Sequence, residues 1–190
     1  MQRVLAVGAV IGAVSVALCT PAFAETDATT RDFWRGAATL APYTVYAPPS
    51  AALKAAGLDR QADSKAMRMQ CRGVWNTDVA FVGDGDRSLS IYQAPSVDCW
   101  PDWGAGQQVE TSTFRAHGRR FEIHYEGCPG KDSEASETAP ADCPPSQTLY
   151  HVDGKLPAAD GEAATWLHAE TVGVTPSQIR QLVRSMAVVS

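Results

Sequence analysis

Histidines and carboxylates are the residues of this sequence best suited to acid–base or metal chemistry. The four histidines are His117, His124, His151 and His168. Glu122, His124 and Glu126 alternate along one predicted strand, so they share a face on which two carboxylates and an imidazole can hold a metal ion. A water-facing strand with cross-strand charge pairs gives the same pattern, and we adopt that interpretation and predict no metal site. His151 and His168 fall in neighbouring predicted strands, where they can pair or serve as structural histidines.

Nucleophile and phosphate motifs are missing from the chain. It lacks the G-x-S-x-G, S-x-x-K and H-E-x-x-H patterns and the glycine-rich phosphate loop. Asp84-Gly85-Asp86 resembles the opening of a calcium loop, but the later ligands of such a loop are missing, and turn chemistry accounts for it. Because catalytic residues can also be assembled from distant positions, these absences do not exclude an enzyme. We predict no catalytic residue and no cofactor.

Two tryptophans form the candidate binding site of the sequence. Trp100 and Trp103 lie in an irregular segment with Gly104 and Gly106, where two aromatic rings can form a stacking platform for a sugar, a peptide or a wall component. Alternatively, both rings pack with Cys99 as a small cluster that caps the sheet.

The N-terminus has the layout of a secretory leader. Arg3 precedes an uncharged run over residues 4–18, and Ala22-Phe23-Ala24 matches the small-x-small cleavage pattern before Glu25. The run is too short to span a membrane comfortably. We therefore predict a signal peptide over residues 1–24, cleaved after Ala24. The alternatives are a retained anchor, or a lipid anchor on Cys19, which follows a leucine where lipoprotein leaders use a small residue.

The remaining residues, 25–190, are predicted to form a single secreted or periplasmic domain. They contain no second long apolar run, so we expect no membrane span in the mature chain. The formal net charge is −5 at pH 7, which disfavours nucleic-acid binding.

Four cysteines remain after the leader, and an even count in an exported chain indicates disulfides. We predict the pairs Cys71–Cys99 and Cys128–Cys143. The second pair closes a segment rich in Pro, Ser, Ala, Glu and Asp, residues 129–147, which we predict to be a mobile acidic loop. Cys71 falls in a predicted strand over residues 67–75, and Cys99 follows a strand and a bend that can fold back over it.

The elements needed to position these residues are mainly strands. Alternating apolar residues predict two hairpins, with turns at residues 83–86 and 116–118, and later strands at residues 149–152 and 164–172. Asp153-Gly154 is predicted to be a turn. The C-terminal helix begins with a Thr175 capping box and carries an apolar stripe. We therefore predict an α+β fold: one antiparallel sheet of six or seven strands, short N-terminal helices, and the C-terminal helix packed on one face.

This layout resembles small bacterial extracytoplasmic domains of the lipoprotein-carrier and anti-sigma-regulator types. The resemblance rests on the order of the elements: a short opening strand with prolines at residues 45–49, two hairpins, a long loop, a strand with Trp166, and the capped helix Thr-Pro-Ser-Gln-Ile-Arg-Gln-Leu. No motif of those domains maps residue by residue. The resemblance implies binding or sensing in the cell envelope.

The function expected from the sequence is therefore a non-catalytic binding module for a hydrophobic, glycan or protein partner in the envelope. Two alternatives remain. One is a small secreted hydrolase that uses His124 or His151 with a nearby carboxylate. The other is an inhibitor of an exported enzyme, with the loop at residues 129–142 as bait.

Overall fold

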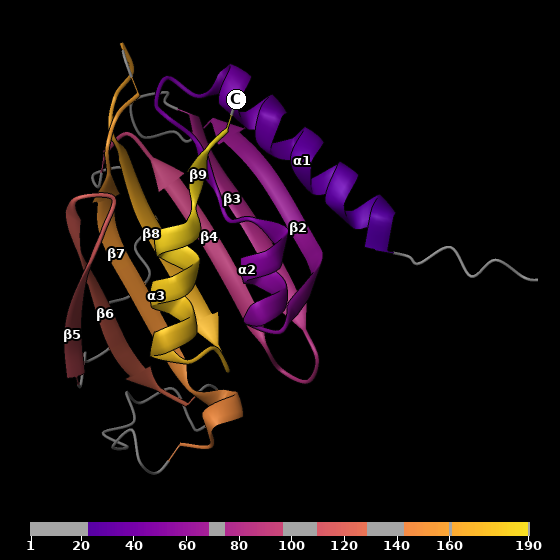
Figure 1. Cartoon of the computed structure of the whole chain (residues 1–190), viewed down its shortest axis with the longest axis vertical. Coiled ribbons are helices and arrows are strands. Elements are labelled where there is room, and N and C mark those ends of the chain that lie inside the picture. Colours follow the sequence, from indigo (N-terminus) through magenta and orange to yellow (C-terminus); the bar gives the residue numbers. More distant parts are fainter. Residues whose placement is uncertain (1–22, 69–74, 97–109, 129–142, 160, 190) are drawn as a thin grey trace, which may run out of the picture.

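Antiparallel strands dominate the structure, a computed structural model that describes residues 23–68, 75–96, 110–128, 143–159 and 161–189 (Figure 1). The main sheet has seven strands in the order β2-β3-β4-β8-β7-β6-β5. In that order the strands are β2 (Leu58–Arg68), β3 (Trp75–Gly83), β4 (Ser88–Ala94), β8 (Thr165–Val172), β7 (Leu149–Leu156), β6 (Arg119–Gly127) and β5 (Glu110–Ala116). The predicted α+β class and antiparallel sheet are confirmed.

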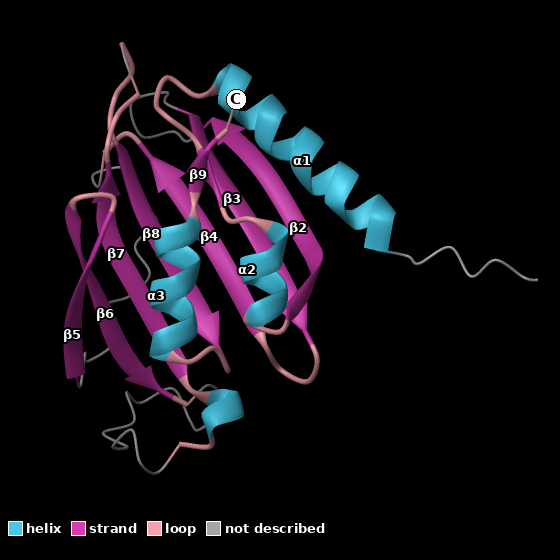
Figure 2. Ribbon diagram, in the orientation of Figure 1, coloured by secondary structure: helices cyan, strands magenta, loops and turns pink. Residues whose placement is uncertain are grey.

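Helices and a second, small sheet complete the described part of the chain. The helices are α1 (Phe23–Leu40), α2 (Ser50–Ala55), α3 (Pro176–Ser185) and the 3-10 helix η3 (Pro145–Gln147). Strands β1 (Tyr46–Ala47) and β9 (Ala187–Val188) pair with each other. Figure 2 shows α2 and α3 side by side across one face of the sheet, and we call this the inner face. No helix of the described residues is long and apolar enough to cross a membrane.

The core lies between the inner face and the helices. Alternate residues of the strands point inward, and among them Val79, Phe121, Val152 and Leu167 are fully buried. After β4 the next described strand is β5, at the opposite edge of the sheet, and β6, β7 and β8 then follow back toward β4. As a result β8 lies between the β3–β4 hairpin and the β5–β6 hairpin. The sheet therefore places β6, β7 and β8 beside one another.

Helix α3 forms as its sequence predicts. The Thr175 hydroxyl accepts from the Gln178 backbone N–H and the Gln178 side chain accepts from the Thr175 N–H, which completes the capping box. The stripe of Ile179, Leu182 and Val183 is buried in the core. These three side chains line the helix side of a narrow space between α3 and the sheet.

Helix α1 is longer than the short helix predicted near residues 31–35. It has 18 residues, because proline is absent from residues 23–41, and it ends before Pro42, whose ring disfavours helical geometry in the preceding residue. The predicted cleavage position after Ala24 falls in its first turn, while residues 1–22 lie outside the described part.

The predicted single strand over residues 67–75 is wrong. Arg68 ends β2 and Trp75 begins β3, and the two residues are cross-strand partners in an antiparallel pair. Met67 and Trp75, which we assigned to one strand, therefore belong to two. Cys71 lies between them, outside the described residues.

The predicted turn at Asp153-Gly154 is also wrong, because β7 continues through both residues to Leu156. Gly154 lies directly opposite Phe121 of β6, and a Cβ atom added to it would lie only 2.1 Å from the Phe121 ring. Phe114 stacks on that ring, with centroids 5.4 Å apart. Gly154 is therefore needed for the close approach of an aromatic ring, not for a turn.

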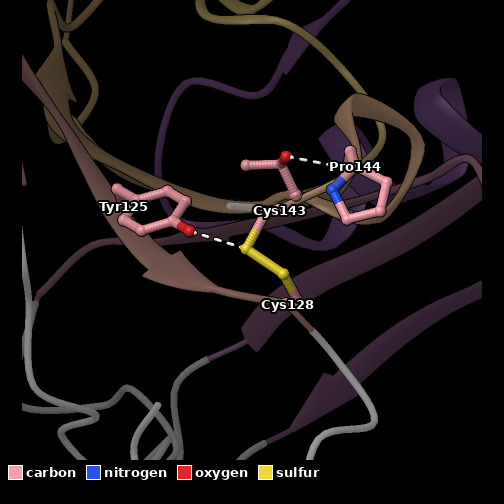
Figure 3. The surroundings of a disulfide bond; sticks show 5 residues. Tyr125, Cys128, Cys143 and Pro144 are labelled. Atoms are coloured by element: carbon pink, nitrogen blue, oxygen red, sulfur yellow. Dashed lines mark hydrogen bonds between the residues drawn. A yellow bond between two sulfur atoms is a disulfide. The ribbon is translucent and has the colours of Figure 1, made fainter. Parts of the chain in front are cut away.

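One disulfide joins the end of β6 to the segment before η3 (Figure 3). Cys128 and Cys143 have Cα atoms 5.8 Å apart, within the ordinary range for a bridge, and this is the pairing expected from the sequence. The Tyr125 hydroxyl lies 2.8 Å from the Cys143 sulfur. The bridge therefore fixes η3 and the start of β7 beside β6.

Candidate functional sites

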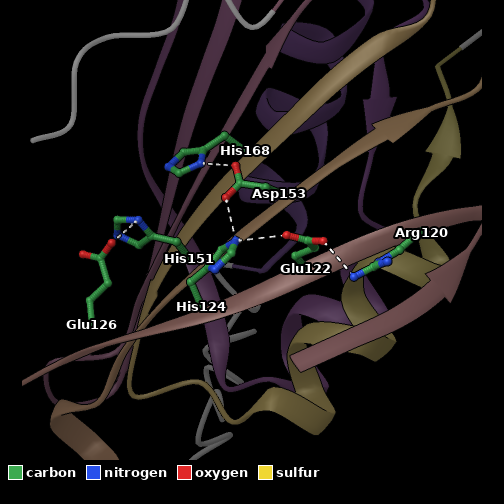
Figure 4. A network of polar contacts seen from close by, with 7 residues as sticks. All are labelled: Arg120, Glu122, His124, Glu126, His151, Asp153 and His168. Carbon is green, nitrogen blue, oxygen red and sulfur yellow. Dashed lines mark hydrogen bonds and ion pairs between the residues drawn. The ribbon is translucent and has the colours of Figure 1, made fainter. Parts of the chain in front are cut away.

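The outer face of the sheet, opposite α2 and α3, carries a cluster of histidines and carboxylates. Figure 4 shows its members, which we call the histidine network: Arg120, Glu122, His124, Glu126, His151, Asp153 and His168. They come from the adjacent strands β6, β7 and β8. The register places His124 opposite His151 and Asp153 opposite His168, so that side chains distant in sequence meet on one face.

Asp153 joins two of the imidazole rings. The Nδ1 atom of His168 lies 2.8 Å from Asp153 Oδ1, and the Nε2 atom of His124 lies 3.5 Å from Asp153 Oδ2. His124 Nε2 also lies 3.8 Å from Glu122 Oε2, and Arg120 pairs with Glu122 at 3.1 Å. A chain of charged and polar groups therefore runs from β6 through β7 to β8.

His151 forms a second pair within the network. Its Nδ1 atom lies 2.9 Å from Glu126 Oε1, and its ring meets that of His168 edge-on, with centroids 5.2 Å apart. Burial, reinforced by His168 and His124 and opposed by Asp153, lowers the pKa of His151 to about 4. Burial and the Glu170 carboxylate raise the pKa of Glu126. His151 is therefore a neutral ring at neutral pH and donates its Nδ1–H to Glu126.

All three histidines of the network are buried. Their exposed fractions are 7% for His124, 9% for His151 and 4% for His168. The prediction that the polar face of β6 meets water is therefore wrong for His124. Alternation along a strand indicates which side chains share a face, but not whether that face is covered. Within the described ranges, no group of three or more His, Cys, Asp or Glu residues is placed to hold a metal ion.

A second candidate site lies on the inner face, as an apolar crevice between α3 and the sheet. Its lining comes from β4, β8, α3 with the residue that follows it, and the segment before α2. It consists of Pro48, Leu89, Ile91, Leu167, Ala169, Thr171, Ile179, Leu182, Val183 and Met186. Thr171 supplies the only hydroxyl among these side chains. The crevice is narrow, with a volume of about 20 Å³, so a ligand larger than a water molecule can enter only if α3 moves away from the sheet, and it then meets almost entirely hydrocarbon.

Polar contacts to the β5–β6 hairpin hold α3 over this crevice. His117, at the hairpin turn, donates from Nε2 to the Val183 carbonyl at 2.8 Å. Arg184 donates to the Arg115 carbonyl at 3.2 Å, and Arg180 donates to the Ser112 hydroxyl at 3.3 Å. His117 has a positive φ of 51°, which is unusual for a residue other than glycine, and it lies in the tight turn between β5 and β6.

Comparison with protein-family models, with curated proteins and with solved structures finds no match. The two sites described above are therefore the observations from which a function has to be inferred.

Several residues singled out by the sequence lie outside the described part of the chain. They are Cys71, Cys99, Trp100, Trp103 and residues 129–142 of the loop predicted at residues 129–147, whose last five residues are described and include Cys143 and η3. The Cys71–Cys99 bridge, the tryptophan platform and the mobile loop stay predictions, and peptide mapping without reduction tests the bridge. The structure brings together His124, His151 and His168, which the sequence named only singly or in pairs. The alternation of the sequence could indicate that each histidine points to the outer face of its strand. It could not indicate that the three strands are neighbours in the sheet.

Proposed function

We propose that this protein is a non-catalytic extracytoplasmic binding module that takes an apolar ligand, such as an acyl chain, between α3 and the sheet. The apolar lining of the crevice is the observation that supports this proposal most directly. Binding sites for apolar ligands are concave and lined mainly by hydrocarbon side chains, with few polar groups. The layout that resembles lipoprotein-carrier domains points in the same direction.

Helix α3 is the movable wall of the proposed site. Its polar anchors reach the β5–β6 hairpin at Ser112, Arg115 and His117, and Gln178 donates to the Ala55 carbonyl at the end of α2. Its contacts with the sheet are apolar. Apolar contacts are not directional, so the helix can shift by a small distance and keep them. Met186 adds an unbranched side chain that adapts to irregular space at the end of the crevice.

The extracytoplasmic location rests on the predicted leader and on the Cys128–Cys143 disulfide, a bond that persists in oxidising compartments. Mass spectrometry of protein recovered from the periplasm or medium should show Glu25 as the first residue. Recovery of mature protein that still begins at Met1, or that carries a lipid on Cys19, would refute the leader assignment.

Ligand binding can be tested with a dansyl-labelled fatty acid of eleven carbons and a matched pair of alanine variants. Ala169 lines the crevice and is 5% exposed, whereas Ala158 is exposed on the surface. We expect saturable binding by the natural protein, at least tenfold weaker binding by Ala169→Leu, and unchanged binding by Ala158→Leu. Absence of saturable binding, or equal binding by all three folded proteins, would contradict the proposal.

A small hydrolase is the second candidate, and the pair of His168 and Asp153 favours it. A carboxylate within 2.8 Å of Nδ1 fixes the tautomer of an imidazole and leaves Nε2 to act as a base, as in hydrolytic triads. Turnover of short nitrophenyl esters that is lost in His168→Gln would support this function. No turnover above the background rate would count against it.

A further inference from the structure

We propose that the histidine network is an acid-sensitive switch, in which protonation of His151 loosens β7 from β6 and β8. The switch is a property of the sheet itself and holds whether or not the crevice takes a ligand. The proposal rests on geometry, because three buried imidazoles from three adjacent strands lie in one cluster. His151 is the central one: it lies opposite His124 and its ring contacts that of His168.

The groups around His151 come from every strand packed against it. On β6, His124 lies opposite it and Glu126 accepts its hydrogen bond. On β8, Glu170 lies opposite it and the ring of His168 touches its ring. On β7 itself, Asp153 follows on the same face. Farther out on this face, the ionisable groups whose side chains the structure describes include Asp78, Tyr92, Arg115, Arg120, Glu122 and Lys155.

One of the carboxylates near His151, Asp153, already contacts the other two imidazoles. Asp153 contacts the rings of both His168 and His124, so a positive charge on either of those rings is paired. Glu126 and Glu170 remain for His151, but burial and the nearby Glu170 carboxylate favour the protonated form of Glu126, which becomes neutral on acidification. A charged His151 would therefore lie buried beside two other imidazoles with little compensation, whereas in an opened sheet water would solvate it.

The sign of the pH effect follows from proton binding. In the closed sheet the pKa of His151 is about 4, against about 6.5 for a solvated histidine, so the open form binds more protons between these values. The closed form is therefore weakened as pH falls below 6.5. The linkage relation gives a weakening of roughly 30-fold by pH 5. The raised pKa of Glu126 acts in the opposite sense, which makes this figure an upper limit.

Loosening of β8 would also reach the inner face. His168 points outward from β8, while its neighbours Leu167 and Ala169 point inward and line the crevice. One strand thus carries both the proton-sensitive cluster and part of the floor beneath α3. Acidification is expected to increase the opening of this floor along with that of β7.

Hydrogen exchange of backbone amides in the natural protein and two histidine variants tests the switch. His151→Asn keeps a donor near the position of Nδ1 but cannot be protonated, and His117→Gln removes the histidine of the distant hairpin turn as a control. We expect protection of β7 and β8 amides, corrected for intrinsic rates, to fall at least tenfold between pH 7.5 and 5. The fall should stay below threefold in His151→Asn and persist in His117→Gln.

An unchanged protection of β7 and β8 in the natural protein, or the same loss in His151→Asn, would overturn the proposal. If His151→Asn does not fold, a proton NMR titration of the four histidine rings in the natural protein decides the question. One ring should titrate near pH 4, and it should be assigned to His151 by its contact with His168. Titration of the His151 ring at or above pH 6 would refute the switch.

Discussion

Replacing Gly154 by alanine should destabilise the fold through one specific collision. The added Cβ would lie 2.1, 2.4 and 2.7 Å from three atoms of the Phe121 ring. Since carbon atoms pack at about 3.5–4.0 Å, the ring must retreat by about 1.5 Å. Phe121 is fully buried and stacked on Phe114, so this retreat disturbs the whole layer.

The expected cost combines two opposing effects. Overpacking a core costs about 1–3 kcal/mol, and the size of this overlap places the cost near the upper end. Alanine restricts the unfolded chain more than glycine, which returns about 0.5–1 kcal/mol. We therefore expect a net loss of about 2 kcal/mol in the free energy of unfolding, measured by urea titration with tryptophan fluorescence and circular dichroism.

A double-mutant cycle with Phe121→Leu isolates the collision. In that background Gly154→Ala should cost less than about 0.5 kcal/mol, because the smaller side chain leaves room for the methyl group. Gly36→Ala is the matched control, since Gly36 lies in α1 with nothing within 4 Å of its Cβ position, and it should be stabilising. Additive effects at Gly154 and Phe121, or a neutral Gly154→Ala, would refute the reasoning.

Three further changes test the packing of the helix and the bridge, each by urea titration. Leu182→Ala should cost about 2–5 kcal/mol as a buried large-to-small change, and a loss below about 0.5 kcal/mol would mean that α3 is not docked. Thr175→Ala removes the capping box and should cost about 1 kcal/mol, while a neutral effect would show that the cap is replaced by water. Replacing Cys128 and Cys143 together by serine should cost roughly 3 kcal/mol, and an unchanged midpoint would mean that the bridge does not form in solution.

Local signals in the sequence predicted the elements that depend on local chemistry. The capping box at Thr175 and the turn residues at positions 83–86 act over a few residues, and their consequences appear where expected. Gly154 shows the opposite case. An Asp-Gly pair is a strong turn signal, but the bulk of Phe121, more than thirty positions earlier, determines what that glycine does.

The histidine network was only partly predictable for the same reason. Sequence alternation placed His124 on the outer face of its strand, but the insertion of β8 between β4 and β7 decides that His168 lies beside Asp153. Gln93 gave no signal at all. It is fully buried, and its side-chain amide accepts a hydrogen bond from the Tyr46 N–H and donates one to the Tyr46 carbonyl. These two bonds attach β1 to β4 in the way that the backbone of a paired strand would.

The pairing of β1 with β9 has a consequence for the order in which the chain folds. Tyr46 lies opposite Val188, and Val189 donates to the Val45 carbonyl at 3.0 Å, so the partners are roughly 140 positions apart along the chain. During synthesis β1 exists long before β9 has been made, and in the meantime its backbone can be bonded by the Gln93 amide and by water. Closing so long a loop costs entropy that no local contact repays. The first strand to be translated therefore acquires its strand partner among the last steps of folding.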